Sequence, residues 1–211
     1  MPLLRAQDSV LVVVDAQAGF VCHDGMDAET RAIASATVDR IAWLVRVADL
    51  LGVPALITEE GAGRNGATDE RIVRRAADAT ATVARTTFGL TGSEEAVAWV
   101  AASGRQIVVL TGFETDVCVA QSGAGLVDLG YRVVVPVDAA YSSNATEHHH
   151  GLERLRSAGA GFSSTKGVTF EWLETIPAAR DVVPRARRDF DELPWRYAAP
   201  PVLAPFRLTP P

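Results

Sequence analysis

The sequence has few cysteines and no long apolar segment, and each shortage excludes a class of protein. Its two cysteines, Cys22 and Cys118, occur in contexts that do not suggest a disulfide bridge, so a disulfide-stabilised secreted domain is not expected. No apolar run approaches the ~20 residues that a membrane-spanning helix needs, and the N-terminus lacks the apolar core of a signal peptide. We therefore expect a cytoplasmic protein with no membrane partner.

Positive charge is also in short supply. The chain has 20 Lys and Arg against 26 Asp and Glu, which gives a net charge of −6. Because the basic residues are dispersed among acids, no basic face is expected that would bind nucleic acid. With 211 residues, 48% of them hydrophobic, the chain is long enough for one well-buried core. These features favour one main domain that acts on a small molecule.

The hydrophobic pattern alternates between short buried strands and amphipathic helices. Strands are expected at residues 10–14, 53–58, 80–84, 107–110, 132–137 and 160–163, and helices at 29–51, 69–78, 93–102, 118–130 and 147–158. This alternation predicts an α/β fold, a Rossmann-like three-layer α/β/α sandwich with a six-stranded parallel sheet. The common strand order, 3-2-1-4-5-6, places the first and fourth strands side by side.

Two chemically capable residues follow those neighbouring strands. Asp15 ends the strand at 10–14, and Cys118 follows the strand at 107–110 through a turn and begins a helix. The helix dipole and the exposed N–H groups of the first turn would lower the thiol pKa and could hold an oxyanion. A turn-capping aspartate and a small core cysteine are the simpler interpretations. Because ligands bind at the carboxyl ends of such strands, the juxtaposition favours a catalytic Asp–Cys pair.

Two other motifs suggest functions that the surrounding residues disfavour. Residues 61–66, GAGRNG, match a dinucleotide fingerprint, but Glu59 and Glu60 precede them and the next strand ends in Arg85 rather than an acid. NADP binding is therefore a minor alternative, no cofactor is expected, and the segment is interpreted as a flexible loop over a site. The triplet at 148–150, HHH, is interpreted as a solvated helix face, since adjacent helical residues point about 100° apart and cannot converge on a metal.

The C-terminal segment has a different composition from the rest of the chain. Residues 189–211 include six prolines from Pro194 onward, interspersed with aromatic residues. We expect a domain over 1–188 and a proline-rich arm over 189–211. The arm would pack on its own subunit or on a neighbour, so a homo-oligomer is expected.

Four segments together resemble the isochorismatase-like cysteine hydrolases. They are VVVDAQAGF, ARTTFG, LTGFETDVCV and DLGYRVVVPVDAAYSS, and the likeness covers about residues 8–175. Its most specific part is the G-x-x-T-D-x-C-V block around Cys118. In that family an Asp, a Lys and a Cys form the catalytic triad of amidases that act on small carboxamides, and a cis peptide shapes the oxyanion hole.

The resemblance assigns roles to particular residues. Asp15 resembles the general base and Cys118 the nucleophile. The cis bond would lie between Phe113 and Glu114, with the N–H groups of Glu114 and Cys118 as oxyanion donors. The family's lysine aligns with Arg85, whose guanidinium can hold charge but cannot readily relay a proton. An ion-paired residue at a strand end is the simpler interpretation of Arg85.

The expected function is cleavage of an amide-type C–N bond through a covalent acyl-enzyme. Phe20, Glu59 and Phe88 are expected to contact the substrate. The alternatives are an isochorismate-type vinyl ether hydrolase, which need not use a nucleophilic cysteine, and a binding relative that lost activity with the change from lysine to arginine. The family's nicotinamidase branch holds a metal with Asp and His after the second strand. This chain has Thr58, Glu59 and Glu60 there, so no metal is expected.

Overall fold

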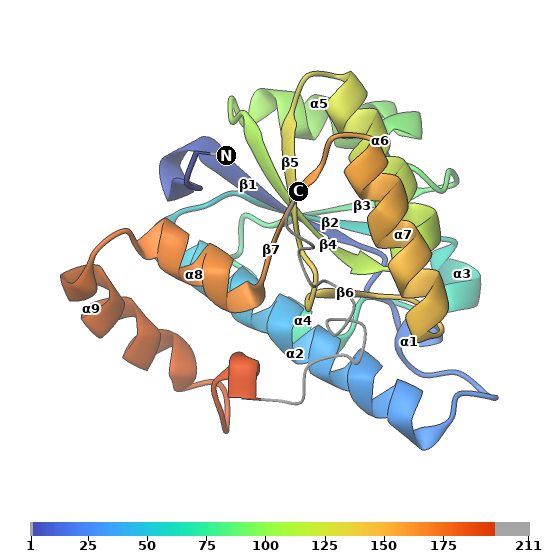
Figure 1. Cartoon of the computed structure of the whole chain (residues 1–211), viewed down its shortest axis with the longest axis horizontal. Helices are drawn as coiled ribbons and strands as arrows, with labels where there is room; N and C mark the ends of the chain where they lie inside the picture. Colours follow the sequence, from blue (N-terminus) through green and yellow to red (C-terminus); the bar gives the residue numbers. More distant parts are fainter. Residues whose placement is uncertain (1, 197–211) are drawn as a thin grey trace, which may run out of the picture.

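A parallel β-sheet with helices on both faces forms the body of the protein in the computed structural model, which describes residues 2–196 (Figure 1). The strands lie in the order β3 (Ala81–Arg85), β2 (Ala55–Glu60), β1 (Ser9–Val14), β4 (Ile107–Phe113), β5 (Arg132–Pro136) and β7 (Gly161–Ser163). This confirms the expected order, with β7 as the sixth strand. A further two-residue strand, β6 (Ala140–Tyr141), pairs with the end of β4 and is too short to leave a pattern in the sequence.

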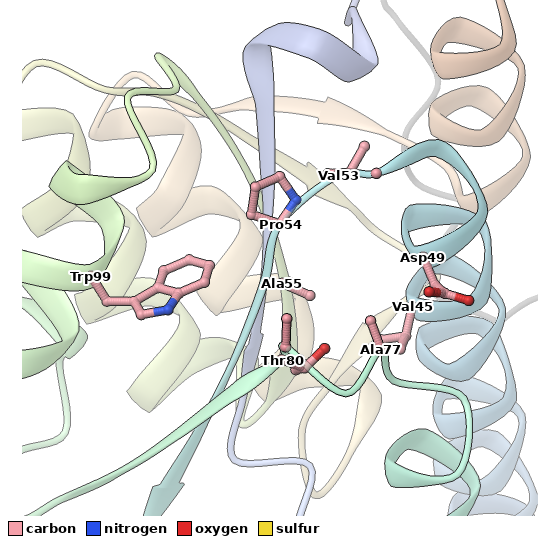
Figure 2. A pocket seen from close by; sticks show the side chains of 10 residues that line it. Val45, Asp49, Val53, Pro54, Ala55, Ala77, Thr80 and Trp99 are labelled. Carbon is pink, nitrogen blue, oxygen red and sulfur yellow. The ribbon is translucent and has the colours of Figure 1, made fainter.

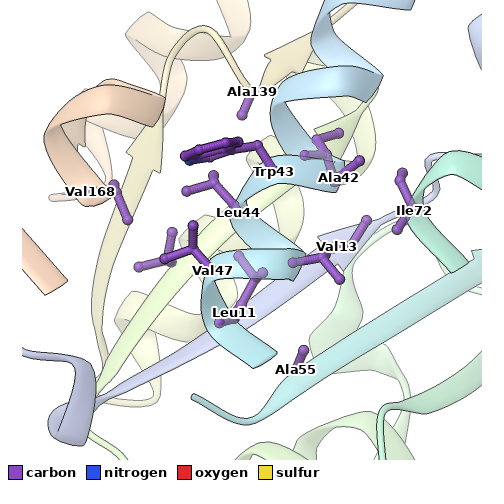
Figure 3. Packing of buried hydrophobic residues seen from close by; sticks show 14 of the residues in the cluster. Leu11, Val13, Ala42, Trp43, Leu44, Val47, Ala55, Ile72, Ala139 and Val168 are labelled. Carbon is purple, nitrogen blue, oxygen red and sulfur yellow. The ribbon is translucent and has the colours of Figure 1, made fainter. Parts of the chain in front are cut away.

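The central strands β1 and β4 are buried at every position, and most of their residues are apolar, as in a parallel sheet that is covered on both faces. In β1, Leu11 and Val13 face one core, while Val10, Val12 and Val14 face the other. The first core packs against the long helix α2 (Ala28–Leu51), whose Trp43 and other apolar side chains are visible in Figure 3. Two packed cores thus hold β1 and β4 rigidly at the centre of the sheet.

The helices divide between the two faces of the sheet. With α2, the first face carries α8 (Thr165–Leu173) and α9 (Ile176–Arg187), and the second carries α5 (Glu94–Ala102), α6 (Ala120–Asp128) and α7 (Ala145–Ser157). Short helices occur in the loops: α1 (Ala18–Val21), α3 (Ala62–Asn65) and α4 (Glu70–Val73). Helix α2 starts at an Asp27 cap that accepts a bond from the Thr30 N–H, and ends at Gly52, whose φ of 66° suits glycine.

Two helices differ from the sequence-based expectation. The helix expected over 69–78 stops at Val73, because Ile72 is the only residue of that segment that is buried and a longer helix would have no apolar face to pack. Conversely, α9 continues to Arg187 through Pro184. Its buried Val182 and Ala186 are four residues apart, so they lie on one face and stabilise the helix.

The described part of the C-terminal arm packs on its own subunit. Phe190 and Trp195 make edge contacts with Trp43, at centroid distances of 5.4 Å and 5.3 Å. The rest of the arm, 197–211, lies outside the described residues, so its place in an oligomer stays a prediction. Among residues 2–196, no helix is both long and apolar enough to cross a bilayer.

Strands β1 and β4 approach each other closely at the carboxyl edge of the sheet. Val14 pairs with Gly112, which has a φ of 126°, and a Cβ there would lie 1.8 Å from the Val14 carbonyl oxygen. Only glycine fits this position. As a result, Asp15 and the segment that follows Phe113 leave the sheet from adjacent points.

Candidate active site

Asp15 is the buried acid at the end of β1. Its backbone φ is 48°, in the left-handed region that Asp tolerates better than most residues, so the chain turns sharply at the strand end. The carboxylate is fully buried and accepts hydrogen bonds from the Arg85 guanidinium and, at 3.4 Å, from the Thr58 hydroxyl. Three neighbouring strands therefore converge on one carboxylate.

Arg85 ends β3 and holds its charge against Asp15. Both side chains of this ion pair have 0% exposure. The guanidinium also donates to the Thr87 carbonyl and, at 2.6 Å, to the Phe88 carbonyl, while its Nε lies 3.5 Å from the Thr58 hydroxyl. Arg85 is thus an ion-paired strand-end residue, and it is also directed into the cluster that contains Asp15 and Cys118.

Cys118 lies in a π-helical turn, Thr115–Val119, between β4 and α6. The regular helix begins at Ala120, not at Cys118 as expected from the sequence, and the peptide bond between Phe113 and Glu114 is cis. π-Helical turns are often found at functional sites. Cys118 is 3% exposed, and its thiol interacts with the Asp15 carboxylate and the Arg85 guanidinium.

The protonation states in this cluster follow mainly from burial. The pKa of Asp15 is raised to about 6, mainly by desolvation and to a smaller degree by the Glu60 charge, against the opposing effects of Arg85 and the Cys118 thiol. Desolvation, followed by the Asp15 charge, raises the pKa of Cys118 to about 12. The expectation that the helix end alone would lower this pKa is therefore wrong. At neutral pH the thiol is protonated and faces an ionised carboxylate.

The glycine-rich segment at 61–66 is anchored by hydrogen bonds. Buried Gln17 donates to the Gly66 carbonyl at 2.6 Å and accepts from the Glu60 N–H at 2.8 Å. The Glu59 carboxylate accepts bonds from both the N–H and the hydroxyl of Thr68, each at 2.8 Å. The sequence predicted a flexible loop and substrate contact through Glu59. In the structure the loop is held to the sheet by these hydrogen bonds, and the Glu59 carboxylate accepts two of them.

A hollow of about 330 Å³ opens at this edge of the sheet. Its lining includes Arg85 with its neighbours Ala84, Thr86 and Thr87, and the loop residues Gly61, Ala62, Gly92 and Ser93. Phe20, Glu59 and Phe88 are not part of this lining. Phe20 is half-buried in α1 against the core, while Phe88 is 56% exposed. Substrate contact by these residues stays a prediction.

Another cavity lies at the opposite edge of the sheet. Figure 2 shows Pro54, Thr80 and Trp99 around this cavity of about 280 Å³, which lies where β2 and β3 begin. Its lining is mostly apolar and includes Asp49 from α2 but no cysteine or histidine. Of these two described cavities, only the hollow beside Arg85 adjoins the Asp15 cluster.

His148 is a functional candidate that the sequence interpretation missed. It was expected on a solvated helix face, but it is fully buried in α7, and its Nδ1 lies 2.8 Å from the Thr115 hydroxyl. The triplet pattern could not show this, because only the packing of α7 on the π-helical turn decides which histidine faces inward. His150 is exposed, as expected. Among residues 2–196, no three His, Cys, Asp or Glu are placed to hold a metal together.

Comparisons with known proteins identify the family of the chain. A model of the isochorismatase domain matches residues 9–167. Isochorismatase family protein 1B of Dictyostelium discoideum is 26% identical over 193 residues, which cover 89% of this chain and 90% of the relative. The matched region of the domain model runs from β1 into α8 and includes Asp15, Arg85 and Cys118.

Two solved structures share the fold. YcaC from Pseudomonas aeruginosa, with hexane-2,5-diol and covalent acrylamide, aligns with a TM-score of 0.77 and 20% identity, over 89% of this chain and 91% of that one. YcaC from Escherichia coli, described as an octameric hydrolase of unknown specificity, aligns with a TM-score of 0.74 and 22% identity, over 89% and 94% of the two chains.

Proposed function

Because the chain belongs to the isochorismatase family of hydrolases, we propose that it cleaves an amide-type C–N bond of a small molecule through a covalent acyl-enzyme on Cys118. The observation that carries this proposal is the buried cluster in which the Asp15–Arg85 ion pair lies beside the buried Cys118 thiol. The covalent acrylamide in the structure of Pseudomonas aeruginosa YcaC supports a reactive group in this fold.

In the acylation step the Cys118 sulfur attacks the amide carbon while its proton moves to Asp15. The gap between a thiol pKa of about 12 and a carboxyl pKa of about 6 makes a free thiolate rare, so proton transfer accompanies formation of the C–S bond. The carbonyl oxygen becomes an oxyanion that the N–H groups of Glu114 and Cys118 would stabilise. The C–N bond then breaks, and Asp15 returns its proton to the leaving amine.

In the deacylation step a water molecule attacks the thioester. Asp15 takes a proton from the water, the C–S bond breaks, and the proton returns to the sulfur as the carboxylic acid leaves. Arg85 cannot relay a proton in either step, because its guanidinium stays charged. Its role is to keep Asp15 ionised and oriented, through the buried ion pair and the carbonyls of Thr87 and Phe88.

The charge near the site favours an uncharged substrate. Four partly buried carboxylates follow β4 or end β2, and each accepts a hydrogen bond from a neutral group: Glu59 from Thr68, Glu60 from Asn65, Glu114 from Ser143 and Asp116 from Ser142. None of them forms an ion pair with another described residue. An isochorismate-type substrate carries two carboxylates, which this surrounding would repel. The amide reaction is therefore preferred to the vinyl ether reaction.

Covalent trapping separates these possibilities. We expect intact-protein mass spectrometry, after acid quenching of turnover with a panel of small uncharged amides, to show one acyl adduct on Cys118. Cys118→Ala should lose both adduct and ammonia release, while the matched change of exposed Cys22, Cys22→Ala, should retain both. Hydrolysis of isochorismate that persists in Cys118→Ala would instead support the vinyl ether alternative, and no turnover at all would support a binding relative.

We also propose that the protein is a homo-oligomer, which the octameric YcaC of Escherichia coli supports. Light scattering of the full chain should give a mass that is a multiple of 22.4 kDa. Deletion of residues 197–211 tests whether the arm contributes to the interface. A monomer at micromolar concentration would contradict the proposal, whereas an unchanged oligomer after the deletion would remove only the role of the arm.

A further inference from the structure

Helix α7 contacts the nucleophile turn at two successive points. The His148 ring is bonded to the Thr115 hydroxyl at 2.8 Å, and both side chains are fully buried. One helical turn later, Gly151 packs against the backbone of Thr115 and Asp116 so closely that a Cβ would lie 2.5 Å from the Asp116 nitrogen. The segment that leads to Cys118 is therefore held from the side by a helix that contributes no group to the reaction described above.

The His148 ring is suited to act as a fixed, uncharged partner. Desolvation lowers its pKa to about 4, against smaller opposing effects that include the Asp116 charge and the Val137 backbone. Its Nε2 has no hydrogen-bond partner of normal geometry within residues 2–196, and the ring packs 5.6 Å from that of Tyr141. The hydrogen bond to Thr115 therefore offsets part of the free-energy cost of burying the polar His148 side chain.

Thr115 is the residue through which this contact can affect the chemistry. It lies one residue beyond the cis bond and is the first residue of the turn, whose Val119 N–H donates to the Glu114 carbonyl at 3.0 Å. A shift of Thr115 would move Glu114 on one side and Cys118 on the other. Both carry the N–H groups that we assign to the oxyanion, and Cys118 must also face Asp15.

We propose that His148 is a positioning residue that holds Thr115 and so sets the Cys118 thiol and the oxyanion donors relative to Asp15. The imidazole does not touch the substrate in this assignment. Misplacement of reacting groups by about 1 Å can lower a rate about 100-fold, so loss of a contact of this kind should lower kcat measurably. The inference rests on the proposed hydrolysis, and its test therefore includes a readout that needs no turnover.

The test compares four single variants and the double variant His148→Phe/Thr115→Val. His148→Phe keeps a ring beside Tyr141 but removes the hydrogen bond to Thr115. Thr115→Val removes the hydroxyl that makes the same bond. His148→Asn retains a polar group near the position of Nδ1. His150→Asn, on the exposed side of the same helix, is the matched control. We expect His148→Phe and Thr115→Val each to lower kcat about tenfold or more with little change in KM, because orientation and not binding is affected.

Two further results would distinguish positioning from general loss of structure. The double variant should be no worse than either single variant, since both remove one interaction, and His148→Asn should recover most of the lost kcat. Thermal unfolding measurements identify any variant that does not fold. If His148→Phe does not fold, the comparison uses Thr115→Val and His148→Asn. Additive losses, an unchanged kcat, or an equal loss in His150→Asn would overturn the proposal.

Alkylation of Cys118 by iodoacetamide supplies the readout that is independent of hydrolysis. We expect His148→Phe to change the alkylation rate of Cys118 several-fold, with that of Cys22 and the His150→Asn control unchanged. If the wild type hydrolyses no amide but this change occurs, the proposed function fails and the positioning role stands. If hydrolysis occurs and neither kcat nor alkylation responds to His148→Phe, the positioning role fails alone.

Discussion

Replacement of Arg85 with Met is expected to abolish most hydrolysis and to destabilise the fold. The change leaves Asp15 buried without its cation, so the pKa of Asp15 rises further and less of the base is ionised at neutral pH. Removal of one partner of a buried ion pair typically costs about 3–5 kcal/mol. We expect kcat/KM to fall by about 100-fold or more, as for loss of a general base, together with a lower midpoint in urea unfolding.

Arg85→Lys is the matched control for this prediction. Lysine keeps the charge beside Asp15 but cannot reproduce every contact that the guanidinium makes with Asp15 and the Thr87 and Phe88 carbonyls. Since the sequence resemblance aligns Arg85 with a catalytic lysine, hydrolysis should be retained or increased even if stability falls. An Arg85→Met variant with wild-type activity would show that the ion pair is only structural. Activity in Arg85→Lys but not in the wild type would identify the natural protein as a binding relative.

Replacement of Asp15 with Asn should lower kcat by a factor of about 100 to 10,000, because general base catalysis is lost while the shape is kept. In the wild type, kcat/KM should rise with pH through about 6 as Asp15 loses its proton. The value of kcat/KM should then stay level to about pH 10, since the Cys118 pKa is about 12 and the thiol does not ionise below that pH. A profile that instead rises near pH 8 would indicate an activated thiolate and contradict the role of Asp15.

The same variant has a second, independent expectation in stability. The pKa of Asp15 is raised from 3.8 in the unfolded chain to about 6 in the native protein, so the native state binds this proton more tightly. Its contribution to stability, about 3 kcal/mol, is fully present below pH ~3.8 and is lost as pH rises through ~6. The stability of Asp15→Asn relative to the wild type, measured as the difference in their free energies of unfolding, should therefore be greater at pH 7 than at pH 4. A difference independent of pH would contradict the raised pKa.

The sequence by itself determined the sheet and the placement of its two central functional residues. The apolar runs that form β1 and β4 are local signals, and parallel α/β topology then places their carboxyl ends together. Asp15 and Cys118 could be paired from this argument alone. The resemblance added the position of the cis bond, which the structure has between Phe113 and Glu114.

Only the tertiary structure decided the environment of those residues. A local pattern carries no information about which groups from distant segments surround a side chain, and burial depends on that packing. Arg85 could be aligned, but its contacts with Asp15 and two carbonyls depend on how β3 and its loop fold back. The raised pKa of Cys118 and the inward position of His148 have the same origin, because desolvation by surrounding segments outweighs the helix-end effect that the sequence suggested.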